Sequence, residues 1–140
     1  MTARKTKVLV VDDQRDIVDT VSFLLQQEGY EVLTAFNGLE ALGVARMEQP
    51  DVIVLDVMMP KENGYQVARH IREDEKAGKI AKRARILMLT ARVVADRERE
   101  DFLQTWSGAD GFMYKPFDLD ELLKRISAML QPSPVEQGGV

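Results

Sequence analysis

Residues 7–13 read Lys-Val-Leu-Val-Val-Asp-Asp, so a run of four apolar residues ends abruptly in two carboxylates. Three further runs of this length occur along the 140-residue chain, at residues 52–55, 86–89 and 111–114. Such runs are too short for helices and do not alternate with polar residues, which is typical of strands buried on both faces of a parallel sheet. Residues 31–35 alternate more and are predicted to form an edge strand.

Helical patterns separate these predicted strands. After the first strand, apolar residues recur at helical spacing up to Gly29, which is expected to end that helix. Capping residues predict the starts of three later helices: Asn37 with Glu40, Asn63, and Asp118 with Glu121. A helix over about residues 95–106 is expected to end at Gly108 and to place three apolar side chains inward: Phe102, Leu103 and Trp106. The charged segment 74–85 is predicted to be a long, mobile connection.

Strand and helix alternate five times, which predicts an α/β protein. Because crossovers between parallel strands are nearly always right-handed, helices are expected on both faces of the sheet. Five strands in this arrangement most often form a flavodoxin-like, doubly wound sheet with the order 2-1-3-4-5. We therefore expect one folded domain over residues 5–131. Residues 132–140 are polar or rich in Pro and Gly and are expected to form a disordered tail.

Composition excludes several classes of protein. The chain has no cysteine, which excludes a disulfide scaffold, a zinc ribbon and a cysteine nucleophile. Its formal net charge of -4 argues against broad binding to nucleic acid, which needs a basic surface. No apolar run approaches the length of a membrane span, and no signal-peptide pattern follows Met1. A cytoplasmic protein that binds neither nucleic acid nor membrane through this domain is expected.

Polar residues interrupt the apolar runs where the strands are expected to end: Asp12, Asp13, Asp56, Thr90 and Lys115. The carboxyl ends of parallel strands share one edge of the sheet, and ligands bind there where the strand order reverses, so these side chains are expected to surround one pocket. Three crowded carboxylates repel one another unless a cation or protons compensate. Oxygen ligands of this kind favour Mg²⁺, and a lysine and a hydroxyl beside it can hold phosphoryl oxygens. The residues predict a magnesium-assisted phosphoryl pocket, in which an aspartate either ligates the metal or attacks phosphorus.

Four stretches in this order and at this spacing resemble the receiver domain of bacterial two-component response regulators: 7–13, 51–60, 86–91 and 114–117. The resemblance covers about residues 5–131. It implies a phosphorylation-dependent signalling switch, which takes a phosphoryl group from a sensor histidine kinase or a histidine phosphotransfer protein and then controls a downstream protein target. Such a protein catalyses its own phosphorylation and slow dephosphorylation but is not a turnover enzyme.

The resemblance implies a role for each residue of the pocket. Asp56 would be the phosphoacceptor. Asp13 and Asp56 would ligate Mg²⁺ directly, together with the backbone carbonyl of Met58, whereas Asp12 would act mainly through water. Lys115 would pair with the phosphoryl group.

The resemblance also implies a conformational switch. Thr90 would reach the phosphoryl oxygen and pull its loop inward. The switch aromatic of the family falls on Phe112, where tyrosine is common, so this chain lacks a hydroxyl there. The surface of the fourth helix, fifth strand and fifth helix would change on phosphorylation. The bond from Lys115 to Pro116 would be cis.

Each site residue also has an ordinary structural interpretation. An Asp-Asp pair after a strand is often a turn or a helix cap, and Asp56 alone could be a loop residue. Thr90 could cap the segment that follows it, and Lys115 could be a surface lysine. Their coincidence at four strand ends, around the point where strand order reverses, favours a common site.

Three other function classes are distinguishable in principle. A binding module that signals without phosphorylation often lacks one of the acids or the lysine. A turnover phosphatase of the aspartyl-phosphate type usually has a second acid two residues after its nucleophile, where this chain has Met58. A histidine phosphotransfer protein using His70 needs a helical bundle, which the buried strand runs exclude.

The sequence leaves the wider assembly open. Only ten residues follow the last predicted helix, too few for a helix-turn-helix reader. A stand-alone receiver and a piece of a longer regulator or hybrid kinase are both compatible with this. The sequence is also compatible with both a monomer and a phosphorylation-dependent dimer.

Overall fold

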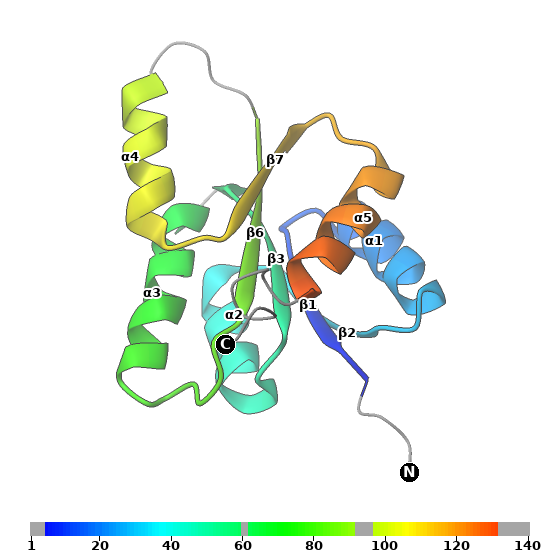
Figure 1. Cartoon of the computed structure of the whole chain (residues 1–140), viewed down its shortest axis with the longest axis horizontal. Helices are drawn as coiled ribbons and strands as arrows, with labels where there is room; N and C mark the ends of the chain where they lie inside the picture. Colours follow the sequence, from blue (N-terminus) through cyan, green and yellow to red (C-terminus); the bar gives the residue numbers. More distant parts are fainter. Residues whose placement is uncertain (1–4, 60–61, 92–96, 132–140) are drawn as a thin grey trace, which may run out of the picture.

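A five-stranded parallel sheet forms the centre of the computed structural model, which describes residues 5–59, 62–91 and 97–131. The strand order is β2-β1-β3-β6-β7 (Figure 1). The strands are β1 (Lys7–Val11), β2 (Glu31–Ala35), β3 (Val52–Asp56), β6 (Arg85–Ala91) and β7 (Gly111–Lys115). Counted along the chain within this sheet, these strands have the order 2-1-3-4-5, so the predicted doubly wound topology is confirmed.

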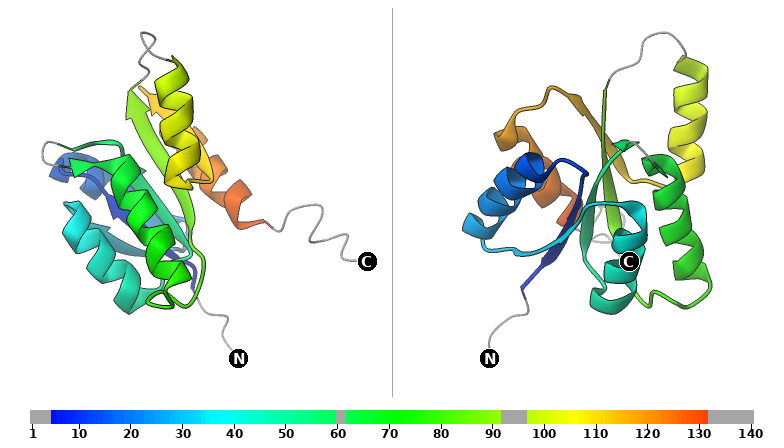
Figure 2. Two further views of the ribbon diagram at one scale, coloured as in Figure 1. Left: turned by 90° about the vertical axis from the view of Figure 1, so that its left-hand side faces the viewer. Right: turned by 180° about the vertical axis from the view of Figure 1, so that it is seen from behind.

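Helices cover both faces of the sheet (Figures 1 and 2). One face carries α1 (Arg15–Gln27) and α5 (Leu119–Leu130), and the other carries α2 (Gly38–Glu48), α3 (Gly64–Lys76) and α4 (Arg97–Ser107). Buried residues of the described chain form two apolar clusters, one on each side. Successive residues of a strand belong to opposite clusters, because side chains alternate across a sheet: in β1, Val8 and Val10 contact one cluster and Leu9 and Val11 the other. This explains why the strands appear as continuous apolar runs.

Side-chain caps fix the starts of three helices at the predicted residues. Asn37 Oδ1 accepts the backbone N–H of Glu40 at 2.9 Å, and Asn63 Oδ1 accepts that of Tyr65 at 2.8 Å. Asp118 Oδ1 accepts the backbone N–H of Asp120 at 2.9 Å. These bonds satisfy donors that the first turn of a helix leaves unpaired. The residues that precede each helix therefore determine where the chain turns away from the sheet.

Glycines end two helices as expected. Gly29 and Gly108 have φ angles of 93° and 76°, in the left-handed region that favours glycine. Gly108 directly follows α4, and Gly29 follows α1 after one further residue, Glu28.

Two expectations about the helices are corrected. Phe102 is 65% exposed rather than inward, whereas Leu103 and Trp106 are half-buried against the core. Helix α4 packs mainly beside α3 (Figure 1), so only a narrow stripe of it is covered. The expected connection over 74–85 begins later, because α3 continues through Lys76.

The segment after α3 is attached to the rest of the fold. The side-chain oxygen Oε1 of Gln49 accepts the backbone N–H groups of Ala81 and Lys82 at 2.9 and 3.1 Å. Ile80 is buried in the cluster beneath α2 and α3. The connection is therefore held by specific bonds rather than lying free over the surface.

A small antiparallel pair that the sequence did not predict follows β3. Strands β4 (Met58–Met59) and β5 (Glu62–Asn63) pair Met58 with Asn63 and Met59 with Glu62. This pair brings the start of α3 back beside the end of β3. The expected tail over 132–140 and the first two residues of the helix expected over 95–106 lie outside the described residues. Within the described ranges, no helix is both long enough and apolar enough to cross a membrane.

Candidate functional site

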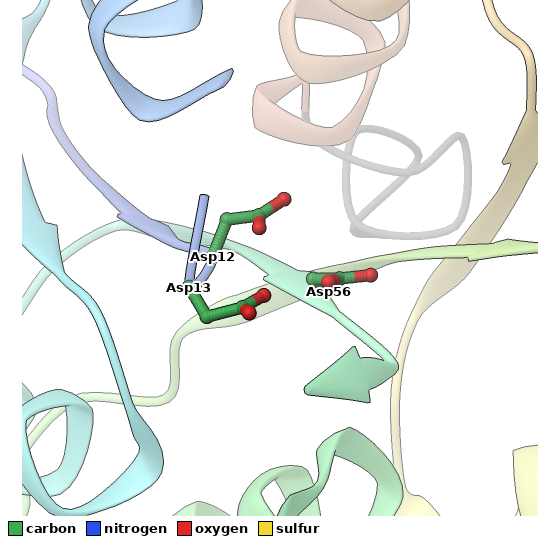
Figure 3. A group of neighbouring side chains, drawn as sticks. All are labelled: Asp12, Asp13 and Asp56. Atoms are coloured by element: carbon green, nitrogen blue, oxygen red, sulfur yellow. The ribbon is translucent and has the colours of Figure 1, made fainter. Parts of the chain in front are cut away.

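Three carboxylates meet at the carboxyl edge of the sheet. Asp12 follows β1 directly, Asp13 comes next, and Asp56 is the last residue of β3. One carboxylate oxygen of each lies within 4.8 Å of those of the other two. The three side chains extend to the same side of the sheet edge (Figure 3). Asp12 and Asp56 are each 2% exposed, whereas Asp13 is exposed, so two of the three residues are buried and the third faces solvent.

Asp12 is a buried carboxylate with one oxygen unpaired. Its Oδ1 accepts the backbone N–H of Gln14 at 2.9 Å, where the chain enters α1. Its Oδ2 is buried and has no hydrogen-bond partner within the described part of the chain. Burial raises the pKa of Asp12 to about 6, and the neighbouring charge of Asp56 adds to this. A buried, ionised oxygen without a partner is costly, so the site favours a proton or a cation here.

Asp56 is paired with a lysine. Lys115, the last residue of β7, donates from Nζ to Asp56 Oδ1 at 3.1 Å, and the backbone N–H of Met58 donates to the same oxygen at 3.3 Å. Burial raises the pKa of Asp56, and Lys115 partly offsets this. The Lys115–Pro116 peptide bond is cis, as expected. Four of the predicted pocket residues thus lie together, from three different strands.

Gly64 allows α3 to approach the end of β3. A Cβ atom at this position would lie 2.5 Å from the carbonyl oxygen of Asp56 and 2.7 Å from Cα of Val57. The backbone N–H of Gly64 donates to the Val57 carbonyl at 2.9 Å. Only a residue without a side chain fits this contact, which fixes the backbone that follows Asp56. Sequence reasoning missed Gly64, although its place directly after the cap Asn63 is visible in the sequence.

Thr90 is the fifth predicted pocket residue. It lies one residue before the end of β6 and is 4% exposed, with the side chain of Tyr65 close by. Tyr65, in the first turn of α3, is itself buried and also lies close to the side chain of Gln104 on α4. Sequence reasoning missed both Tyr65 and Gln104, because no local pattern indicates a contact between α3, α4 and β6.

The site and its fold can be compared with known proteins. The family model described as the response regulator receiver domain matches residues 8–127. The chain belongs to this family. Its receiver domain is 42% identical over 129 residues to the alkaline phosphatase synthesis transcriptional regulatory protein PhoP of Bacillus subtilis, covering 92% of this chain and 50% of PhoP. It is 39% identical over 126 residues to the DNA-binding dual master transcriptional regulator RpaA of Synechocystis, and the match covers 89% of this chain and 49% of RpaA.

A solved receiver structure shows the same fold. The chemotaxis protein CheY4 of Vibrio cholerae superimposes with a TM-score of 0.78 at 35% identity, and the match covers 91% of this chain and 100% of CheY4. The chain spans about half the length of the two curated relatives named above. The identification from four short sequence stretches is therefore confirmed.

The switch aromatic expected for this receiver domain is Phe112. It lies on β7, paired in register with Met88, and is half-buried against the apolar cluster on the side of α2, α3 and α4. A phenyl ring has no group that can donate or accept a strong hydrogen bond. Phe112 therefore offers no hydroxyl at this position of β7.

The acidic cluster fits a hard divalent cation. It offers only oxygen ligands, from Asp12, Asp13 and Asp56, and it leaves the buried Oδ2 of Asp12 without a hydrogen bond from the described residues. Mg²⁺ prefers such ligands and keeps part of its shell for water and phosphate. The Met58 carbonyl lies in the chain segment directly after Asp56, while the Met58 side chain is 67% exposed. The receiver domain can hold a metal here.

Proposed function

We propose that this receiver domain is a phosphorylation-dependent signalling switch whose phosphoacceptor is Asp56. The donor would be a phosphohistidine of a sensor histidine kinase or of a histidine phosphotransfer protein, meeting the receiver in the cytoplasm. The main support is that Lys115 donates to Asp56 inside a cluster of three carboxylates. This combination offers an acceptor oxygen, a fixed positive charge and a cation site within one pocket.

The transfer is a displacement at phosphorus. A carboxylate oxygen of Asp56 attacks the phosphorus atom while the bond from phosphorus to the donor imidazole nitrogen breaks, and that nitrogen keeps the electron pair. The product is an aspartyl phosphate and a neutral histidine. Burial disfavours the isolated charge of Asp56, and the pairing with Lys115 keeps the carboxylate ionised and oriented. Lys115 then pairs with the oxygens of the phosphoryl group.

Mg²⁺ would be held by Asp13, Asp56 and the backbone carbonyl of Met58, with Asp12 acting through a bound water. Bound there, it supplies positive charge that neutralises the phosphoryl oxygens. The unpaired Oδ2 of Asp12 supports this assignment, because it is the oxygen that a metal-bound water would satisfy.

The readout would be a change in the face formed by α4, β7 and α5. Thr90 moves toward the phosphoryl group and Phe112 moves inward, which biases a two-state surface that binds a downstream protein. Attack of water on the aspartyl phosphate then releases inorganic phosphate and restores Asp56. The protein is thus a switch rather than a turnover enzyme.

Phosphorylation by a small donor tests this function. The protein is incubated with Mg²⁺ and acetyl phosphate, and its intact mass is measured beside those of Asp56→Asn and Asp19→Asn. Asp19 is an exposed acid on α1, so it is a matched control for the loss of one carboxylate. We expect a single phosphoryl adduct on the parent and on Asp19→Asn, and none on Asp56→Asn. An adduct that persists in Asp56→Asn, or folded parent protein without any adduct, would refute the proposal.

A further inference from the structure

We infer that Glu62 is a positioning residue for Asp56, the proposed phosphoacceptor, and that it acts from the β4–β5 pair through Met58. This inference rests on the proposed function and adds a residue to it. It starts from a bond between two segments that are far apart in the sequence. Glu62 Oε2 accepts the backbone N–H of Gly38, the first residue of α2. The carboxylate thus joins the segment that follows β3 to the start of α2.

Gly38 takes its hydrogen bond from Glu62 because the local capping groups of α2 serve other donors. Asn37 Oδ1 accepts the backbone N–H of Glu40, and Glu40 Oε1 accepts that of Phe36. Gly38 is buried, and a buried N–H in the first turn of a helix needs an acceptor. A carboxylate is a favoured acceptor here, because the positive end of the helix dipole lies at this terminus. Glu62 is therefore held against α2.

The space at Gly38 fits the Glu62 carboxylate closely. A Cβ atom at this position would lie 2.6 Å from Oε2 of Glu62 and 2.7 Å from Cγ2 of Val67. Alanine here would therefore push the flexible end of the Glu62 side chain away from the helix. Gly38→Ala thus breaks the same bond as a substitution of Glu62, from the side of the other partner.

The β4–β5 pair connects Glu62 with Asp56. Glu62 is paired in register with Met59, and Asn63 is paired with Met58. The backbone N–H of Met58 donates to Asp56 Oδ1 at 3.3 Å, which orients the carboxylate that is proposed to take the phosphoryl group. Holding Glu62 at α2 therefore holds β4, and with it the backbone group that orients Asp56.

This strand pair needs support from outside itself. Each of its strands has two residues, and so short a pair is not stable alone. On the side of α3, the backbone N–H of Gly64 donates to the Val57 carbonyl at 2.9 Å. Glu62 supplies the support on the side of α2. Removing its acceptor should therefore loosen β4 while the contact at Gly64 remains.

The rate of labelling by acetyl phosphate at saturating Mg²⁺, followed by intact mass, measures this role. In Glu62→Met, which lacks the acceptor, we expect labelling to slow by on the order of tenfold, because Asp56 is oriented less well. Glu62→Gln keeps a carbonyl oxygen that can accept from Gly38, and it should label within about twofold of the parent rate. Glu31→Met removes an exposed glutamate at the start of β2 and should label at the parent rate.

Two further measurements separate the loss of this bond from a general loss of structure. The backbone amide proton resonance of Gly38, followed by NMR without phosphoryl donor, should move upfield in Glu62→Met and stay near the parent position in Glu62→Gln. Gly38→Ala should slow labelling as Glu62→Met does. The double variant should be no slower than either single variant, because both changes remove one and the same bond.

The outcomes separate this role from the proposed function. Slow labelling of Glu62→Met that is restored in Glu62→Gln supports the positioning role. Labelling of Glu62→Met at the parent rate overturns the role and leaves phosphorylation of Asp56 intact. Equally slow labelling of Glu62→Gln, or an unmoved Gly38 resonance in Glu62→Met, overturns it as well. A folded parent protein that takes up no phosphoryl group overturns the proposed function, and the positioning role with it.

Discussion

Lys115 Nζ lies 3.1 Å from Asp56 Oδ1, although the two residues end strands that are not neighbours in the sheet. The lysine reaches across the end of β6 to pair with a side chain that is only 3% exposed. Breaking this pair leaves a buried carboxylate without its compensating charge. The pair therefore connects the stability of the sheet edge with the proposed phosphoryl chemistry.

Removing the lysine charge should slow phosphorylation strongly. In Lys115→Met, we expect labelling of Asp56 by acetyl phosphate to slow by on the order of a hundredfold, because a fixed charge beside the developing phosphoryl group is lost. The rate of adduct formation in intact mass spectra measures this. Lys124→Met removes an exposed lysine of α5 and should label at the parent rate. Equal rates in Lys115→Met and the parent would show that the lysine has no part in the transfer.

The pH dependence of stability without metal follows from Asp12. Its pKa in the folded state is about 6, above the ordinary value of 3.8, so the folded protein binds more protons between these pH values. The free energy of unfolding should therefore fall as pH rises from about 4 to about 6 and then level off. Asp12→Asn should be more stable than the parent by about 3 kcal/mol at pH 7, and nearly equal to it at pH 4.

Urea unfolding with a chelator, and again with excess Mg²⁺, checks the Asp12 prediction. Mg²⁺ should stabilise the parent protein more than Asp12→Asn, because the cation compensates a charge that the variant lacks. A parent whose stability does not respond to Mg²⁺ at pH 7 would contradict the proposed metal site.

The close contact at Gly64 should make this position intolerant of a side chain. Gly64→Ala places a Cβ 2.5 Å from the Asp56 carbonyl oxygen, so we expect a loss of about 2 kcal/mol in the free energy of unfolding and slower labelling of Asp56. Gly43→Ala is the matched control, since a Cβ there meets nothing within 4 Å. That variant should gain about 0.5–1 kcal/mol from better helix propensity. Equal stabilities of the two variants would refute the contact.

A buried arginine at the opposite edge of the sheet should contribute to stability but not to phosphorylation. Arg72 donates to the carbonyl oxygens of Ala84 at 2.7 Å and Gly108 at 2.9 Å, and to Asp110 Oδ2 at 2.7 Å. Arg72→Met should lower the free energy of unfolding by about 3 kcal/mol, because it leaves these buried groups unpaired. Urea unfolding measures the loss. Slower labelling of Asp56 under conditions where Arg72→Met is fully folded would contradict this separation.

The sheet and most of the pocket could be predicted because they depend on local patterns. Each buried strand appears as a short apolar run, and a polar residue within or after it marks the carboxyl edge where Asp12, Asp56 and Lys115 meet. The helix caps at Asn37 and Asn63 are likewise local. The strand order was predicted from the order that five strands alternating with helices most often adopt.

What could not be predicted depends on contacts between distant elements. The β4–β5 pair has strands of two residues, too short to show a periodicity. Tyr65 and Gln104 come together only because α3 and α4 pack side by side. The same packing explains why Phe102 is exposed. Phe102 lies one helical turn before Trp106, as an inward residue would, but the part of α4 that packs against α3 is too narrow to cover its side chain.

Chemical mapping of the phosphorylated residue tests the central claim most directly. The protein is labelled with acetyl phosphate and Mg²⁺, reduced with borohydride, which converts an aspartyl phosphate to homoserine, and digested for peptide mass spectrometry. We predict homoserine at position 56, and none at positions 12 or 13. Homoserine at either of those positions instead, or at no position in protein that is folded, would contradict the assignment of Asp56 as the phosphoacceptor.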